Sequence, residues 1–131
     1  MAFIPKMPEA AHRNLQAADQ LDAGHRRDVA GYLYGLAAEC AIKQMVILLR
    51  LPQQINKKDI LFAHFPHLRT LLRDAFTGRR GAAVWAVIIN NKFLHNWDVA
   101  MRYADATQIS DEWVNDWRQQ ARDVVSAMET L

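Results

Sequence analysis

The stretch RRDVAGYLYGLAAECAIKQMVILL, residues 26–49, decides the fold of this chain. Its apolar residues lie on nearly every side of a helix, which is typical of a helix buried at the centre of a bundle. Its most apolar part, residues 29–49, is almost long enough to cross a bilayer, but Glu39, Lys43 and Gln44 stand in its middle and argue against a membrane span. We therefore predict a buried central helix, in which Gly31 and Gly35 permit close packing against neighbouring helices.

Four further segments show apolar residues at helical spacing. They are 11–21, 68–76, 82–94 and 111–131. Gly24, Gly78 and Gly81 punctuate the chain between them, and Ser110 stands where an N-cap of the last helix belongs. The stretch 53–65 has no clear period and is predicted as a loop or a frayed turn. Without strand-like alternation, the pattern predicts an all-α, antiparallel up-and-down bundle of about five helices.

Length and composition indicate a single domain over residues 1–131. Hydrophobic residues make up 51% of the chain and charged residues 23%, which is ordinary for a globular protein. The 16 basic and 14 acidic residues leave a net charge of +2, too close to balance for charge alone to indicate a nucleic-acid-binding protein. Any basic binding site must therefore be local.

Cysteine usage and the N-terminus bear on the cellular compartment. Cys40 has no second thiol to pair with, and the N-terminus shows no signal-peptide pattern. We therefore expect a cytoplasmic protein that does not enter a membrane.

Some residues that could have a functional or metal-binding role also have a structural explanation. Glu39 and Lys43 stand four apart, so an ion pair within the helix explains them as well as a functional role does. His64 and His67 have a spacing that suits a metal, but Pro66 separates them and no third ligand is near, so we favour a loop that leads into a helix. We expect neither a metal nor a cofactor.

Two tryptophans and two arginines are also explained by structure better than by a binding role. Trp113 and Trp117 lie on the apolar face of the last helix, where packing in the core or in a dimer explains them better than base stacking does. Arg79 and Arg80 are interpreted as a solvated turn, and a phosphate site is the alternative.

The segment NNKFLHNWDVAMRYADA, residues 90–106, has the strongest functional pattern, because polar residues follow abruptly on an apolar helix. On a helix, Asn91 and His95 would be one turn apart, with Lys92 in the neighbouring row. His95 could then transfer protons near neutral pH, while Lys92 and Arg102 hold a phosphate. The alternative, a capped helix end with solvated charges, is favoured by geometry alone.

Three motifs together resemble the HEPN family over about residues 10–128. They are GYLYGLAAECAIK (31–43), FAHFPHLRTLL (62–72) and NWDVAMRYADA (96–106). The resemblance implies a small helical bundle, commonly dimeric, of a family in which many members are metal-independent RNases of defence and toxin–antitoxin systems. Such enzymes carry an arginine and a histidine that are separated by four to six residues.

In this chain the NNKFLH motif has the histidine, His95, but Asn90 takes the place of the arginine. A neutral amide cannot hold a scissile phosphate in the bidentate fork of a guanidinium. Trp97 stands where one toxin branch has a tyrosine that is modified. The resemblance also implies that Glu39 and Lys43 share a patch with His95.

Three functional hypotheses follow. The first is a catalytically weak or inactive HEPN-like domain that binds RNA, a nucleotide or a partner protein. The second is a metal-independent RNase that uses His95, Asn90 and Asn91, with Lys92 or Arg102 replacing the arginine. The third is a structural dimerisation module beside a nucleotidyltransferase or another defence protein. We expect a homodimer, because the apolar helices offer more surface than one small bundle can bury. We also expect Arg102 and Tyr103 to be ordered, with the rings of Trp97 and Tyr103 packed.

Overall fold

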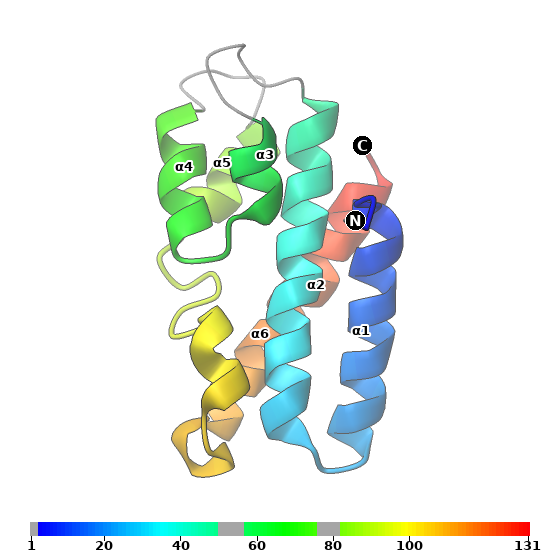
Figure 1. The fold of residues 1–131 in the computed structure, drawn as a ribbon, viewed down its shortest axis with the longest axis vertical. Helices are drawn as coiled ribbons and strands as arrows, with labels where there is room; N and C mark the ends of the chain where they lie inside the picture. Colours follow the sequence, from blue (N-terminus) through cyan, green and yellow to red (C-terminus); the bar gives the residue numbers. More distant parts are fainter. Residues whose placement is uncertain (1–2, 50–56, 76–81) are drawn as a thin grey trace.

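The computed structural model describes residues 3–49, 57–75 and 82–131, and helices dominate all three segments (Figure 1). The α-helices are α1 (Met7–Ala23), α2 (Arg27–Leu48), α3 (Lys57–Phe62), α4 (His67–Ala75), α5 (Ala82–Ile89) and α6 (Asp111–Glu129). Two short 3-10 helices, η2 (Val99–Tyr103) and η3 (Ala106–Gln108), precede α6. The described residues contain no strand, which confirms the all-α class.

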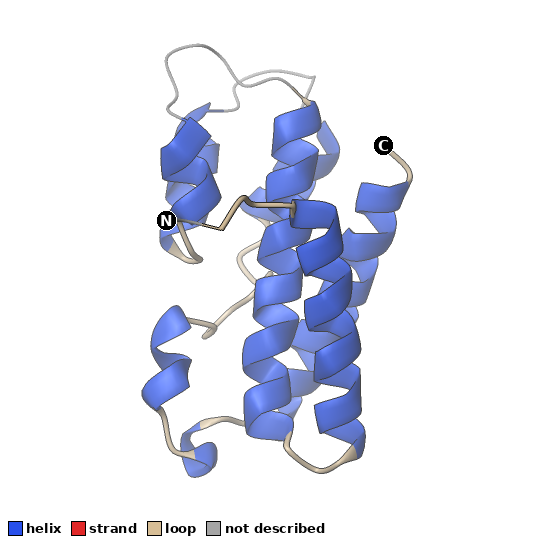
Figure 2. Cartoon of the chain, turned by 45° about the vertical axis from the view of Figure 1, so that its right-hand side comes forward, coloured by secondary structure: helices blue, strands red, loops and turns tan. Residues whose placement is uncertain are grey.

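Three long helices, α1, α2 and α6, form the centre of the bundle (Figure 2). The helix α1 runs antiparallel to α2 and α6, whose first turns meet where Arg27 pairs with Asp111 (Figure 1). The helix α2 lies between the pair α1 and α6 and the shorter helices α3, α4 and α5, which cover its other side (Figure 1). Burial along α2 is nearly continuous and includes Ala30, Tyr34, Ala37, Ala38, Ala41, Ile42, Met45 and Val46. The predicted central helix is therefore confirmed.

The boundaries of the long helices follow from local sequence signals. The helix α1 ends one residue before Gly24, and α2 begins and ends within one residue of the prediction. Ser110 Oγ accepts a hydrogen bond of 3.2 Å from the Glu112 N–H, as an N-cap does. Trp117 lies fully buried on the apolar face of α6, as expected for a core residue.

Carboxylates of α1 join the three long helices at the bundle surface. Asp22 pairs with Arg27 of α2 at 2.8 Å and with Arg118 of α6 at 3.2 Å. The buried Tyr34 hydroxyl donates to Asp19 at 2.6 Å, and burial raises the pKa of that hydroxyl. These contacts fix the register of α1, α2 and α6.

Two predicted element boundaries were wrong. The stretch 53–65 was predicted as a loop, but residues Lys57–Phe62 form α3, a helix too short for its period to be recognised. The fourth predicted helix was expected to reach Leu94, yet α5 ends at Ile89. Predictions on Gly78, Arg79, Arg80 and Gly81, and on residues 53–56, fall outside the described residues.

Candidate functional site

Residues 90–97 form a chain of tight turns. The Phe93 N–H donates to the Asn90 carbonyl at 2.9 Å, and the Trp97 N–H donates to the Leu94 carbonyl at 3.1 Å. Leu94 and Asn96 have φ values of 50° and 63°, which an α-helix does not allow. The predicted helical alignment of Asn91, Lys92 and His95 is therefore wrong, and we name this segment the His95 turn.

Side chains of α6 and α4 hold the His95 turn from both sides. Gln120 accepts a hydrogen bond from the Leu94 N–H at 2.9 Å and donates one to the Lys92 carbonyl at 2.9 Å. Trp117 Nε1 donates to the His95 carbonyl at 2.9 Å. Arg69 of α4 donates to the carbonyl of Phe93, and the Arg69 guanidinium also lies 5.6 Å from the Phe65 ring. These bonds replace those that a continued helix would have made.

Trp97 attaches the end of the turn to α2. Its indole lies directly over Gly35, so closely that a Cβ atom on residue 35 would overlap the ring. The ring is nearly parallel to that of Tyr32, with centroids 5.9 Å apart, and Trp97 Nε1 donates to the Tyr32 carbonyl at 3.3 Å. Gly35 therefore gives the turn its place on the bundle.

His95 has a partner on each ring nitrogen. Its Nε2 lies 3.0 Å from Asp116 Oδ2, and its Nδ1 lies 3.2 Å from the Asn96 amide nitrogen. In this arrangement Nε2 can donate to the carboxylate while Nδ1 accepts from the amide. The His95 side chain is 29% exposed, so solvent reaches the ring although both nitrogens are engaged.

The predicted cations lie on exposed surface. Lys92 projects from the His95 turn, and Arg102 projects from η2. The ion pairs among the described residues are formed by other cationic side chains, so neither Lys92 nor Arg102 pairs with a carboxylate there. The Arg102 guanidinium lies 5.5 Å from the Tyr103 ring, and its charge opposes the rise that burial causes in the pKa of Tyr32.

Asn90 and Asn91 are both exposed, and the side chain of Asn90 caps its own turn by accepting from the Lys92 N–H at 3.0 Å. Arg102 and Tyr103 lie in η2 and not in a free loop, as expected. The expected packing of the Tyr103 ring was wrong, because Tyr103 is 82% exposed and Tyr32 takes that place beside Trp97.

Glu39 forms a second polar cluster on the other side of the turn. It is 1% exposed, accepts a hydrogen bond of 2.6 Å from the Phe65 N–H and lies 2.9 Å from His64 Nδ1. Its close partners therefore belong to the chain that leads into α4, and Lys43 acts on Glu39 through its charge. His64 thus has a structural contact in the loop, as predicted.

Burial dominates the ionisation of Glu39 and Lys43, the two charged residues in the middle of α2. It raises the pKa of Glu39 more than His64, Lys43 and the Phe65 N–H lower it. Lys43 is 4% exposed, and burial lowers its pKa. The cluster connects to the His95 turn through Phe65, whose ring packs edge-on against Phe93 at 5.5 Å. Hydrogen bonds to Glu39 thus hold the aromatic pair that supports the turn.

Sequence reasoning missed the residues that shape the site from a distance. Arg69, Asp116 and Gln120 lie 21 to 28 positions from the residues of the turn that they contact. Asp116 and Gln120 stand four apart beside the apolar face of α6, which indicates a shared row on the helix. Nothing in that spacing identifies their partner.

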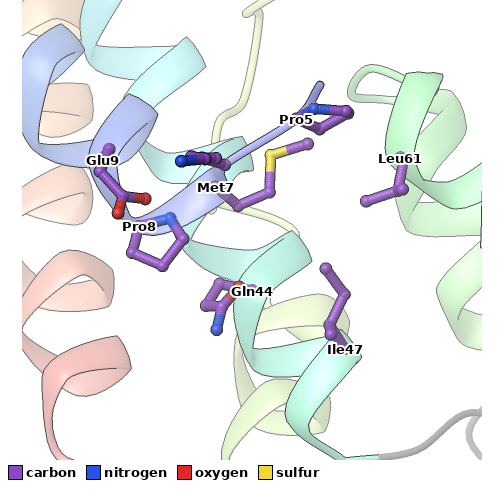
Figure 3. A pocket seen from close by; sticks show the side chains of 8 residues that line it. Pro5, Met7, Pro8, Glu9, Gln44, Ile47 and Leu61 are labelled. Carbon is purple, nitrogen blue, oxygen red and sulfur yellow. The ribbon is translucent and has the colours of Figure 1, made fainter. Parts of the chain in front are cut away.

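Hollows on the surface of the described residues lie near the site and away from it. One of about 400 Å³ is lined by Arg26, Tyr32 and Arg102, and one of about 230 Å³ by Asn96, Gln108 and Trp113. A third, of about 430 Å³, lies between the start of α1, the end of α2 and α3, where Pro5, Met7, Gln44, Ile47 and Leu61 surround it (Figure 3). None of the predicted site residues lines this third hollow.

In residues 3–49, 57–75 and 82–131, no three His, Cys, Asp or Glu side chains gather in a way that could hold a metal ion. No helix in these ranges has the length and apolar content to cross a bilayer. No protein-family model, curated protein or solved structure matches this chain.

Proposed function

We propose that this chain is a HEPN-like domain that binds RNA or a nucleotide at the His95 turn and cleaves RNA weakly or not at all. The observation that carries the proposal is the pairing of both His95 nitrogens, with Asp116 at 3.0 Å and Asn96 at 3.2 Å. A general base needs a free nitrogen within reach of the proton that it removes. Both nitrogens of this ring are in use.

The absence of a clamp for the phosphate supports weak catalysis. Asn90 stands where the resemblance implies an arginine, and its side chain accepts a hydrogen bond from the Lys92 N–H. Arg69 brings a guanidinium to the turn, but that group donates to the carbonyls of Phe93 and Asn90. A pentavalent phosphate would therefore lack its bidentate partner.

Binding is supported by cations that the protein does not neutralise. Lys92 and Arg102 are exposed without carboxylate partners in the described chain, so phosphate groups can approach them without breaking an ion pair. Such contacts release counterions from single-stranded RNA and make the affinity depend on salt.

A metal-independent RNase is the second candidate, and the pair His95–Asp116 favours it. A carboxylate on one imidazole nitrogen orients the ring, so release of Asn96 would leave the other nitrogen free to accept a proton. Asn96 is exposed and could move aside.

One gel assay with EDTA separates the two candidates. It compares RNA cleavage by the wild type, His95→Ala and Asn90→Arg at equal concentration. The proposal expects little cleavage by any of the three proteins, because both ring nitrogens of His95 are engaged. The RNase candidate expects a gain in Asn90→Arg, because that substitution restores the clamp. Robust wild-type cleavage that disappears in His95→Ala would favour the RNase.

Binding is measured separately with labelled RNA and with a nucleotide across a salt series. Lys92→Ala and Arg102→Ala should each weaken RNA affinity and reduce the salt slope by about 0.7, while His95→Ala should matter little. Arg13→Ala, at an exposed position on α1, is the matched control and should change neither quantity. If neither the wild type nor any variant binds RNA or a nucleotide, the structural dimerisation module is the hypothesis that remains.

We extend the proposal to the setting that the resemblance implies, which is a homodimer in a defence or toxin–antitoxin system, with a nucleotidyltransferase or another defence protein as partner. Light scattering over a concentration series tests the dimer. A monomer at high concentration would contradict it.

A further inference from the structure

The hollow of about 230 Å³ lies beside the His95 turn, between the start of α6 and the segment that carries η2 and η3. Trp117, which is buried, and Trp113, which is partly buried, both line it, with the two ring centroids 6.1 Å apart. Met101 and Ile109 complete an apolar lining. The described residues that line the hollow include no charged side chain.

Two carboxamides stand among these apolar groups. Asn96 and Gln108 both line the hollow and both are exposed. Each amide offers donors and an acceptor, and Asn96 uses its nitrogen on His95, which leaves its oxygen to accept from a ligand. An aromatic face beside paired donors and acceptors suits a flat, uncharged heteroaromatic ring, which is the chemistry of a nucleobase.

The size indicates room for one part of a larger ligand. Whole ligands occupy pockets of about 300–1,000 Å³, and this hollow is smaller. The hollow of about 400 Å³ adjoins it, since Met101, Ala104 and Ile109 line both. That second hollow contains Arg26 and Arg102, the first of which is only loosely paired with Asp28 at 3.6 Å.

We propose that the hollow of about 230 Å³, which Trp113 lines, is a nucleobase subsite. Arg102 in the adjoining hollow then binds the phosphate of the same nucleotide, which is either free or part of an RNA chain. The inference rests on the proposed function and deepens it, because it adds recognition of a base to the binding of a phosphate. It assigns Trp113 a stacking role, whereas Trp117 serves the core.

The test compares a labelled 12-nucleotide RNA with an abasic 12-mer of the same backbone, with fluorescence anisotropy as the readout. Trp113→Ala should weaken RNA binding about tenfold or more, because stacking on an aromatic side chain is lost, and should leave abasic binding unchanged. Trp113→Phe keeps a ring face and should stay within a fewfold of the wild type. Trp85→Ala, on α5 and outside both hollows, is the matched control.

Gln108→Ala provides a second variant at an exposed position, in case Trp113→Ala does not fold. It should weaken RNA binding severalfold and leave abasic binding intact. Titration of AMP, adenosine and inorganic phosphate identifies the source of the ligand. AMP that binds more tightly than adenosine or phosphate, and loses affinity in Trp113→Ala, supports the subsite for a free nucleotide even if the RNA does not bind.

Two outcomes would overturn the inference while the proposed function survives. One is equal binding of RNA and abasic 12-mer that depends on Lys92 or Arg102 and ignores Trp113→Ala. The other is an equal loss of both ligands in Trp113→Ala and Gln108→Ala, which would show a structural effect. If neither RNA, abasic 12-mer nor AMP binds, the inference and the proposed function fail together.

Discussion

Replacement of Gly35 by alanine tests the contact that places the His95 turn on the bundle. A Cβ atom at residue 35 would lie 2.5 Å from Trp97 Cδ1 and closer still to Nε1 and Cε2. These are atoms of a rigid ring that is almost fully buried. The indole must therefore move as a whole, away from both Gly35 and Tyr32.

The size of the effect follows from opposing contributions. Overpacking a filled site costs about 1–3 kcal/mol, and the hydrogen bond and stacking contact of Trp97 with Tyr32 are worth about 1 kcal/mol each. Alanine is favoured over glycine within a helix by about 1 kcal/mol, which offsets part of the loss. We expect Gly35→Ala to lower the free energy of unfolding by about 3 kcal/mol and the Tm by about 10 °C.

Urea and thermal unfolding followed by circular dichroism measure this change. Gly31→Ala is the control in the same helix, since its Cβ would lie 3.0 Å from the nearest atoms of Trp117 and Val114 and needs only a small adjustment. In a Trp97→Ala background the clash is absent, so Gly35→Ala should become neutral or stabilising. An equal cost of Gly35→Ala in both backgrounds would refute the reasoning.

Three other predictions concern the supports of the site. Burial raises the pKa of Glu39 above its ordinary 4.5, so the folded protein holds that proton more tightly than the unfolded chain does. The wild type therefore loses stability as the pH rises through the raised pKa. In urea unfolding, Glu39→Gln should be more destabilising at pH 4 than at pH 7, and the reverse trend would contradict this. Arg69→Met should cost about 1–2 kcal/mol and speed amide exchange in the His95 turn, because the Phe93 carbonyl loses its donor; unchanged exchange would count against it. Ser110→Ala should cost about 1 kcal/mol in thermal unfolding, and an equal loss in Ser126→Ala, at an exposed position inside α6, would show that the effect is not one of capping.

The long helices could be predicted because their signals are local. Apolar spacing and the residues next to the helix ends set α1, α2 and α6 to within a few residues, and Ser110 acts as the cap that its position indicates. The buried position of Glu39 also follows from its place in an apolar helix. In each case, neighbours within one or two turns contain the information.

The His95 turn depends on contacts that no local pattern contains. The sequence from Asn90 to Leu94 is compatible with a helix, but Gln120 and Arg69 take up its main-chain groups, and Trp97 settles on Gly35 more than 60 residues earlier. The partners of His95 and Glu39, which are Asp116 and His64, are likewise brought near by packing. The sequence by itself determined the helices and the candidate polar residues. Only the tertiary structure decided which of them meet, because hydrogen bonds and packing between distant segments outweigh the weak helical preference of a short polar stretch.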